Sequence, residues 1–255
     1  MNTIKIYYRP FPLIRYQKQV TVNCPDSFSE LSPKQFIAIA NLLRGIITEI
    51  QFLRILTGIP KRVMRLLTPF DKYKLSELTQ PFFELRPYHE FFLKYIASGD
   101  LLCPKNKLKN ISFSQFIFAD SYFSSYSQNN DPDDLYKLIA SLYLPQGRIF
   151  DEKVIDENLH LAKKTDAETL QAIAINYQLI REWLALAYPL IFSKEDNKPS
   201  KVTPAASTNW VKVFDALVGD DIVNHDKYAD MPLHTAFRYM TSRIKDNMKR
   251  KKHYR

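Results

Sequence analysis

The segment of residues 166–192 is the longest regular element that the sequence predicts, and it constrains the fold more than any other stretch. Its apolar residues recur at intervals of three and four, which is the spacing of one face of an α-helix. Most polar side chains fall outside that face. The segment is therefore predicted to be a core helix. Its apolar face comprises Leu170, Ile173, Ala174, Tyr177, Ile180, Leu184 and Ala187, and Glu168, Gln171, Gln178 and Arg181 lie off it.

Shorter helices are predicted where a capping residue or a proline precedes helical spacing and a glycine or proline follows it. Ser32, Pro33 and Gln35 form the start of a capping box, and Gly45 can end the helix that they open. The next helix should bury Ile46, Ile50, Leu53 and Leu56 and stop at Gly58. Further helices are expected over residues 61–67, 69–78, 81–96 and 111–126, and over 131–144 behind a cap at Asp131.

Two more helices are predicted near the C-terminal end of the sequence. Asn209 is expected to cap a short helix that Gly219 ends. Met231 and Pro232 should open the last helix, whose apolar residues follow at steps of four, three, four and four. The apolar residues are Trp210, Val213, Phe214 and Leu217 in the first helix, and Leu233, Phe237, Met240, Ile244 and Met248 in the second.

The N-terminal residues 3–22 differ from the rest, because β-branched and aromatic residues alternate there around a Pro-Phe-Pro break. They predict two short strands or a hairpin. The fold class is therefore mostly α, a multi-helix bundle with a short N-terminal β-hairpin. The predicted parts are a β segment over 1–30, a helical domain over 31–193, a polar linker over 194–208 and a C-terminal helical segment with a basic tail over 209–255.

The sequence shows no motif for a cofactor or for catalysis. Its five glycines are widely scattered, whereas a phosphate-binding loop or a Gly-x-Ser-x-Gly nucleophile turn needs several close together. Cys24 and Cys103 form no Cys-x-x-Cys pair, and none of the five histidines stands in an HExxH motif or at ligand spacing. We therefore expect a protein that is not an enzyme and needs no cofactor.

One acidic cluster offers an alternative. Asp220, Asp221, Asp226 and Asp230 lie close together in the sequence, and hard cations such as Mg²⁺ prefer carboxylate oxygens. A metal-dependent enzyme could be built on them. The order of the residues lacks the calcium-loop pattern, however, and aspartates at these positions also suit helix caps. Of the two roles, helix capping is the one that we predict for these aspartates.

The sequence predicts neither secretion nor insertion into a membrane. Prolines interrupt the N-terminal residues, so no apolar stretch reaches the length of a signal peptide. The longest apolar run covers residues 184–192 and is about half as long as a membrane-spanning helix must be. Two cysteines without a pairing pattern fit a reducing compartment.

Positive charge is concentrated at both ends of the sequence. The whole chain carries a net charge of +9, yet residues 1–20 hold four Lys or Arg and no acid, and residues 241–255 hold seven with one Asp. The rest is close to neutral. The C-terminal run could bind nucleic acid by releasing counterions, dock on an acidic protein, or simply stabilise a helix end. Its candidate binding residues are Arg243, Lys245, Lys249, Arg250, Lys251, Lys252 and Arg255.

Three stretches carry a family resemblance. They are residues 24–36 with the Leu-Ser-Pro-Lys-Gln-Phe helix start, residues 52–60 followed by the helix of Leu75 and Leu78, and residues 210–221 before the helix that starts at Met231. Together, over about a third of the chain, they resemble small helical proteins encoded in the tail-morphogenesis regions of bacteriophages and prophages, especially those of Bacteroides-like bacteria. The matching positions are helix starts and packing residues.

The resemblance implies a tail-assembly chaperone or minor virion protein that binds phage proteins such as a tail-tube or tape-measure subunit. It places the chain in the cytoplasm of a bacterial host, with the virion as the alternative location. The alternative function is nucleic-acid binding through the basic terminal segments. A homo-oligomer, ring or filament is as compatible with the sequence as a monomer.

Overall fold

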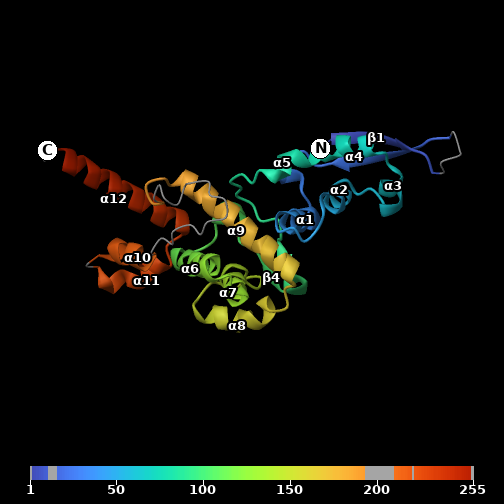
Figure 1. Ribbon diagram of the computed structural model, residues 1–255. Helices are drawn as coiled ribbons and strands as arrows, with labels where there is room; N and C mark the ends of the chain where they lie inside the picture. Colours follow the sequence, from blue (N-terminus) through green and yellow to red (C-terminus); the bar gives the residue numbers. More distant parts are fainter. Residues whose placement is uncertain (1, 11–15, 193–209, 220, 254–255) are drawn as a thin grey trace. The chain divides into compact units, whose positions relative to one another are not determined.

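The computed structural model describes residues 2–10, 16–192, 210–219 and 221–253 (Figure 1). The fold is mostly α-helical with an N-terminal β-hairpin, which confirms the predicted fold class. The chain divides into two compact units, Met1–Arg86 and Pro87–Arg255.

The first unit begins with the antiparallel strands β1 (Asn2–Tyr8) and β2 (Lys18–Cys24). Asn2 lies opposite Cys24 and Tyr8 opposite Lys18, so the two strands are paired along their whole length. Alternation places Ile6 on the buried face of the hairpin. The predicted strand pair is therefore confirmed.

Five helices follow in this unit, most of them opened by a side-chain cap. Ser32 and Gln35 form the predicted capping box, in which Gln35 Oε1 accepts from the backbone N–H of Ser32 at 2.9 Å. Thr48 and Thr68 open two further helices in the same way. The elements are η1 (Phe28–Glu30), α1 (Pro33–Leu43), α2 (Glu49–Thr57), α3 (Lys61–Leu66), α4 (Pro69–Ser76), η2 (Glu77–Thr79) and α5 (Gln80–Phe83).

The hairpin shares one hydrophobic core with these helices. Ile6 and Val22 from the strands pack with buried residues of α2, α3, α4 and their connections. The boundary between the two units consequently lies at Arg86, inside the segment 31–193 for which one helical domain was predicted. The helical partners of the hairpin are Leu53, Ile59, Met64, Leu67 and Leu75.

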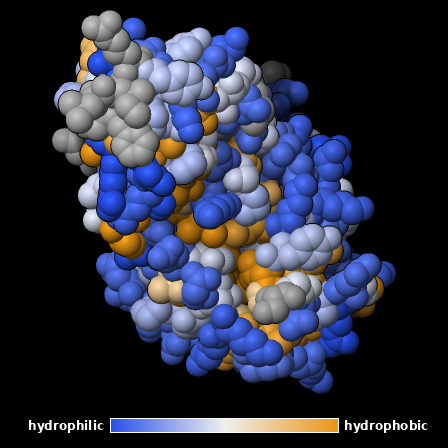
Figure 2. All heavy atoms as spheres, turned by 90° about the vertical axis from the view of Figure 1, so that its right-hand side faces the viewer, coloured by the Kyte–Doolittle hydropathy of each residue, from blue (hydrophilic) through white to orange (hydrophobic). Residues whose placement is uncertain are grey.

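The start of α2 differs from its predicted apolar face. Leu53 and Leu56 are buried as expected. Ile46 lies before the helix, which begins at Glu49, and is 53% exposed, while Ile50 in the first turn is 54% exposed. Helical spacing identifies a face without showing where the helix or its buried part begins, and the buried residues of α2 begin at Phe52. On the face of the molecule drawn in Figure 2, hydrophobic side chains gather between hydrophilic ones.

The second unit contains the long helices. A short hairpin of β3 (Tyr95–Ile96) and β4 (Leu101–Leu102) precedes them, with the turns η3 (Ala97–Gly99) and η4 (Asn106–Leu108). Helix α7 packs against α6, α8 and α9. The helices are α6 (Phe113–Asn129), α7 (Pro132–Leu142), α8 (Lys153–Ala162), α9 (Ala167–Ala187), α10 (Trp210–Val218), α11 (His225–Ala229) and α12 (Leu233–His253), with η5 (Ile222–Asn224) before α11.

The predicted helix over residues 81–96 is wrong. Helix α5 ends at Phe83, and the chain then runs extended to β3. Pro87 disfavours helical geometry at the residue before it. The extended segment is held by α9 instead: Asn176 Oδ1 accepts from the N–H of Phe92 at 3.0 Å, and Asn176 Nδ2 donates to the carbonyl of Glu90 at 2.9 Å.

Several other boundaries differ from prediction. Helix α9 ends at Ala187 and not at Phe192, because Pro189 excludes helical geometry at Tyr188. Ala187 is exposed and Arg181 buried, the reverse of their predicted positions. Helix α8 was not predicted at all. The proposed linker 194–208 and the predicted cap Asn209 lie outside the described residues. Among the described segments, every helix is too short or too polar to cross a bilayer.

Candidate functional site

Helix α12 carries six of the seven predicted binding residues and is anchored to the start of α6. The backbone N–H of Leu233 donates to the carbonyl of Ile111 at 3.1 Å, and the N–H of Phe113 donates to the carbonyl of Met231 at 2.8 Å. Leu233 is buried, like most of the apolar stripe that follows it in the first half of the helix. The N-terminal half of α12 therefore belongs to the core of the second unit.

Aromatic rings fix this half of the helix. Trp210 of α10 stacks on Phe237 of α12 with ring centroids 5.9 Å apart, and Phe116 of α6 meets both rings edge-on at 4.9 and 5.4 Å. Aromatic pairs prefer such offset and perpendicular arrangements. The sequence prediction that Trp210 and Phe237 lie on apolar helix faces is confirmed.

A buried ionic network lies beneath these rings. Asp120 of α6, fully buried, accepts hydrogen bonds from Arg181 Nε at 2.9 Å, from the Tyr177 hydroxyl at 3.3 Å and from Trp210 Nε1 at 2.6 Å. Burial, followed by the Asp120 charge, raises the pKa of Tyr177 well above its usual range, so its hydroxyl stays a donor. The network joins α6, α9 and α10. Because it is buried, we interpret it as stabilising the fold and not as a binding site.

The C-terminal half of α12 leaves the core. Met248, predicted to continue the apolar stripe, is 51% exposed, and Lys245, Lys249 and Arg250 are exposed around it. Among the ion pairs between described residues, none involves these three cations. Their positive charge is therefore available to a ligand. Lys251 and Lys252 belong to the last turn of α12, and Arg255 lies outside the described residues.

Arg243 plays a different part. Its Nη1 donates to the carbonyl of Leu217 at 3.2 Å and lies 3.4 Å from that of Ala216, at the C-terminal end of α10. Its guanidinium also lies 5.7 Å from the ring centroid of Tyr239. A cation that satisfies the last carbonyls of a helix stabilises that helix end. Arg243 thus holds α10 against α12.

Several other basic residues of α12 form a row, whereas Arg250 and Lys251 fall outside it. At 100° per residue, His234, Arg238, Lys245 and Lys249 fall within a sector of about 60°, and Lys252 continues it by position. Arg238 and Lys249 are about 16 Å apart along the helix axis, at 1.5 Å per residue. We call residues 238, 245 and 249 the basic row. At its N-terminal end the row meets a pocket.

This pocket has a volume of about 460 Å³ and lies between the end of α9, the turn η4 and the first turns of α12. Its lining has three cations and three aromatic rings, and no carboxylate among the residues that form it. We call it the Trp183 pocket. The lining residues are Lys107, Lys109, Trp183, Ala187, Tyr188, His234 and Arg238.

His234 is held by hydrogen bonds on both ring nitrogens. Its Nε2 lies 2.5 Å from the carbonyl oxygen of Lys107 and its Nδ1 lies 2.7 Å from the Tyr188 hydroxyl. A carbonyl oxygen only accepts, so Nε2 carries a proton, and in the neutral ring Nδ1 accepts from Tyr188. Burial raises the pKa of Tyr188, which keeps that hydroxyl protonated. The imidazole therefore ties η4 to both α9 and α12.

The turn beside His234 is strained. Lys107 and Leu108 have φ angles of +65° and +55°, a region that side chains other than glycine rarely adopt. The strain is held by the His234 contact, by the burial of Leu108, and by the N–H of Lys107, which donates to the carbonyl of His89 at 2.8 Å. It places Lys107 Nζ 6.0 Å from the ring centroid of Trp183.

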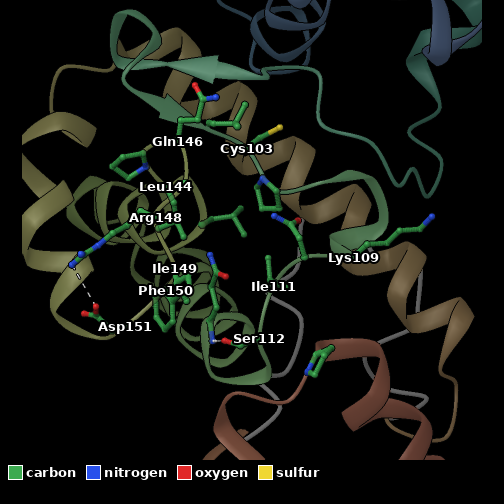
Figure 3. Close-up of a pocket in the computed structure, with 18 of the residues that line it drawn as sticks. Cys103, Lys109, Ile111, Ser112, Leu144, Gln146, Arg148, Ile149, Phe150 and Asp151 are labelled. Carbon is green, nitrogen blue, oxygen red and sulfur yellow. Dashed lines mark hydrogen bonds and ion pairs between the residues drawn. The ribbon is translucent and has the colours of Figure 1, made fainter.

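A second cleft in this unit has a volume of about 670 Å³ (Figure 3). Its one sulfur nucleophile is inactive at neutral pH, because burial raises the pKa of Cys103 to about 11. Arg148 at its edge is engaged by Asp151 at 3.4 Å and by Glu157 at 3.1 Å. This cleft therefore offers no activated thiol, and its one lining cation outside the ion pairs between described residues is Lys109, which also lines the Trp183 pocket.

The described residues of the acidic cluster do not form a group that could hold a metal ion. Asp221 accepts hydrogen bonds from Asn224 Nδ2 at 2.8 Å and from the Tyr228 hydroxyl at 3.2 Å, which agrees with a role in local turn structure. Asp220 lies outside the described residues. In the parts of the chain that the structure describes, no three His, Cys, Asp or Glu side chains gather closely enough to hold a metal ion.

Sequence reasoning missed the Trp183 pocket, since its residues come from three distant segments, near positions 107, 185 and 236. The one available signal was the sequence Met-Pro-Leu-His at the start of the last helix, which places a histidine next to buried residues.

No family model, curated protein or solved structure matches the chain.

Proposed function

We propose that the protein binds single-stranded nucleic acid along α12 and performs no catalysis. One observation carries this proposal: the basic row is exposed on a single sector of the helix and leads into a pocket of cations and aromatic rings. Grooves for single strands combine the same two features, cations along the backbone and aromatic rings for the bases. Residues 21–240 are close to neutral in net charge, which is compatible with a narrow binding track.

Binding along this track should depend strongly on salt. Each phosphate neutralised on a single strand contributes roughly 0.7 to the slope of log affinity against log salt. In the double variant Lys245→Gln/Lys249→Gln we expect a slope shallower by about 1.4, with weaker binding at every salt concentration. The measurement is fluorescence anisotropy with a labelled oligonucleotide of about ten residues, a length within the range of single-strand sites.

The matched control is Lys61→Gln/Arg62→Gln, which removes the same charge from exposed positions of α3 in the other unit. This control should keep the slope and most of the affinity. Absence of binding at low salt, or equal losses in the two double variants, would overturn the proposal.

A protein partner is the second proposed function, in line with the phage tail-assembly resemblance. Its support is three exposed apolar residues close in sequence at the α1–α2 connection, where Leu43, Ile46 and Ile50 are each at least 40% exposed. Exposed apolar residues that lie together commonly mark protein contacts. The partner would be a tail-tube, tape-measure or other virion protein in the cytoplasm of a bacterial host.

A tagged protein recovered from infected cells should carry such a phage protein with it. The variant Ile46→Gln/Ile50→Gln should lose it, while Ile149→Gln/Val211→Gln, which changes two exposed apolar residues of the other unit, should retain it. Recovery of nucleic acid alone would count against this second function.

A further inference from the structure

The Trp183 pocket has the composition of a site for one nucleotide. Its volume of about 460 Å³ is within the range of small-molecule sites. Its aromatic rings, together with its ammonium and guanidinium groups, match a ligand with a flat ring and an anionic group. We propose that the pocket binds a nucleotide, with its base against the Trp183 indole and its phosphate among Lys107, Lys109 and Arg238.

The proposal rests on the proposed nucleic-acid function and adds to it a specific site at which one nucleotide of the strand binds. Along the basic row alone, any polyanion would be held by charge. The pocket would instead hold one base and its phosphate, so that a strand has a defined point of attachment. The same chemistry is shared by a free mononucleotide and by one nucleotide of a strand.

The indole of Trp183 is available as a stacking surface. Its side chain is only partly buried, and Lys107 Nζ lies over the ring at 6.0 Å from its centroid. Lysine is a flexible side chain, so this ammonium can move aside onto a phosphate while a base takes its place. His89 and His234 contact Trp183 at centroid distances of 5.6 and 6.2 Å and hold the ring in position.

The cations that would bind the phosphate of the ligand are also held in position by the protein. Lys107 is presented by a strained turn whose backbone is tied to both His89 and His234. Arg238 lines the pocket, and it is oriented by a hydrogen bond from its Nε to the carbonyl of His234 at 3.1 Å. Lysine and arginine are the side chains that proteins use to bind phosphate. Strain at a turn that carries a cation agrees with a binding role.

Trp183 itself provides the test. The chain has two tryptophans, and Trp210 is 2% exposed and bonded to Asp120, so base stacking should quench only the emission of Trp183. The full-length protein is titrated with AMP, with a ten-residue oligonucleotide and with inorganic phosphate. We expect quenching by AMP and by the oligonucleotide, and none by phosphate, which has no ring to stack.

Variants separate the two ends of the ligand. Trp183→Phe should abolish the quenching signal and weaken AMP binding, measured by calorimetry, about tenfold. Lys107→Ala and Arg238→Gln should each weaken it to a similar extent. Lys105→Ala is the matched control, because Lys105 is exposed two residues away and does not line the pocket. The unchanged emission of Trp210 in Trp183→Phe reports that the second unit is folded.

The outcomes distinguish this proposal from the proposed function. An oligonucleotide that binds with a normal salt slope and leaves Trp183 emission unchanged would overturn the pocket and keep the basic row. Quenching by AMP without strand binding would support the pocket as a site for free nucleotides and overturn the strand function. Equal binding of phosphate and AMP, or equal losses in Lys107→Ala and Lys105→Ala, would also overturn the pocket.

Discussion

The indole N–H of Trp210 lies 2.6 Å from Oδ2 of Asp120, while Oδ1 of the same carboxylate lies 2.9 Å from Nε of Arg181. One buried carboxylate thus joins three helices that are distant in sequence. A buried ion of this kind is stable only while its hydrogen bonds are made. The contact also fixes Trp210 under Phe237, and through it the direction of α12.

Replacing Asp120 by Asn should destabilise the second unit strongly. The substitution leaves the Arg181 charge buried opposite a neutral amide, and breaking a buried pair costs about 3–5 kcal/mol. The measurement is urea unfolding followed by tryptophan emission, because both tryptophans lie in this unit. Asp133→Asn is the control: its ion pair with Lys163 is exposed and 3.9 Å long, so the free energy of unfolding should change by less than about 1 kcal/mol.

Asn176 should be as sensitive as Asp120 for a different reason. Its amide satisfies the N–H of Phe92 and the carbonyl of Glu90, so Asn176→Ala removes the hydrogen bonds to two backbone groups at a cost of about 1–3 kcal/mol each. Gln178→Ala on the exposed side of α9 should be close to neutral, although it removes a hydrogen bond to Glu182. An equal effect of the two substitutions on urea unfolding would contradict this account.

Local signals in the sequence were enough to predict most of the secondary structure. Ser32 and Gln35, Asp131 and Gly58 mark helix ends through contacts within a few residues, and the structure has those ends. The alternation in residues 3–22 likewise identified the hairpin. Each of these features depends on neighbours in the chain, so it can be read without knowing the fold.

Features that depend on distant residues could not be predicted. Arg181 looked like a solvent-facing residue of its helix, and only its partner Asp120, sixty-one residues away, makes its burial favourable. The extended segment around Glu90 is held by Asn176 in the same way. The Trp183 pocket is the extreme case, since it exists only where three separate segments meet. The basic C-terminal residues were found because charge is visible in composition alone.

Gly58 should tolerate asparagine better than alanine. It ends α2 at φ +69°, where an L residue with a Cβ is strained by roughly 1–2 kcal/mol, although nothing lies within 4 Å of the added carbon. Asparagine adopts this geometry more readily. We expect Gly58→Ala to lower the free energy of unfolding by about 1 kcal/mol or more and Gly58→Asn by less, measured by circular dichroism. The reverse order would show that another contact limits this position.

Both cysteines should react slowly with alkylating agents at neutral pH. Burial raises the pKa of Cys24 and of Cys103 to about 11, above the usual thiol value near 8.5. Since the thiolate is the reactive form, the rate should rise about tenfold per pH unit between pH 7 and 9.5. Because folding raises the pKa of both thiols, their contribution to the free energy of unfolding is complete below about pH 8.5. That contribution is lost as the pH rises toward 11. Rates that level off near pH 8.5 would contradict this.

Tyr188→Phe separates positioning from charge in the proposed nucleotide site. The change removes the hydroxyl that bonds His234 Nδ1 at 2.7 Å but leaves every cation in place. Losing one such hydrogen bond costs about 0.5–1.5 kcal/mol, so AMP should bind roughly threefold to tenfold more weakly. The salt slope for the oligonucleotide should stay unchanged, because the same number of phosphates is neutralised. A purely electrostatic site would instead leave AMP affinity unaltered in Tyr188→Phe, and a shallower slope would show that Tyr188 aligns the cations themselves.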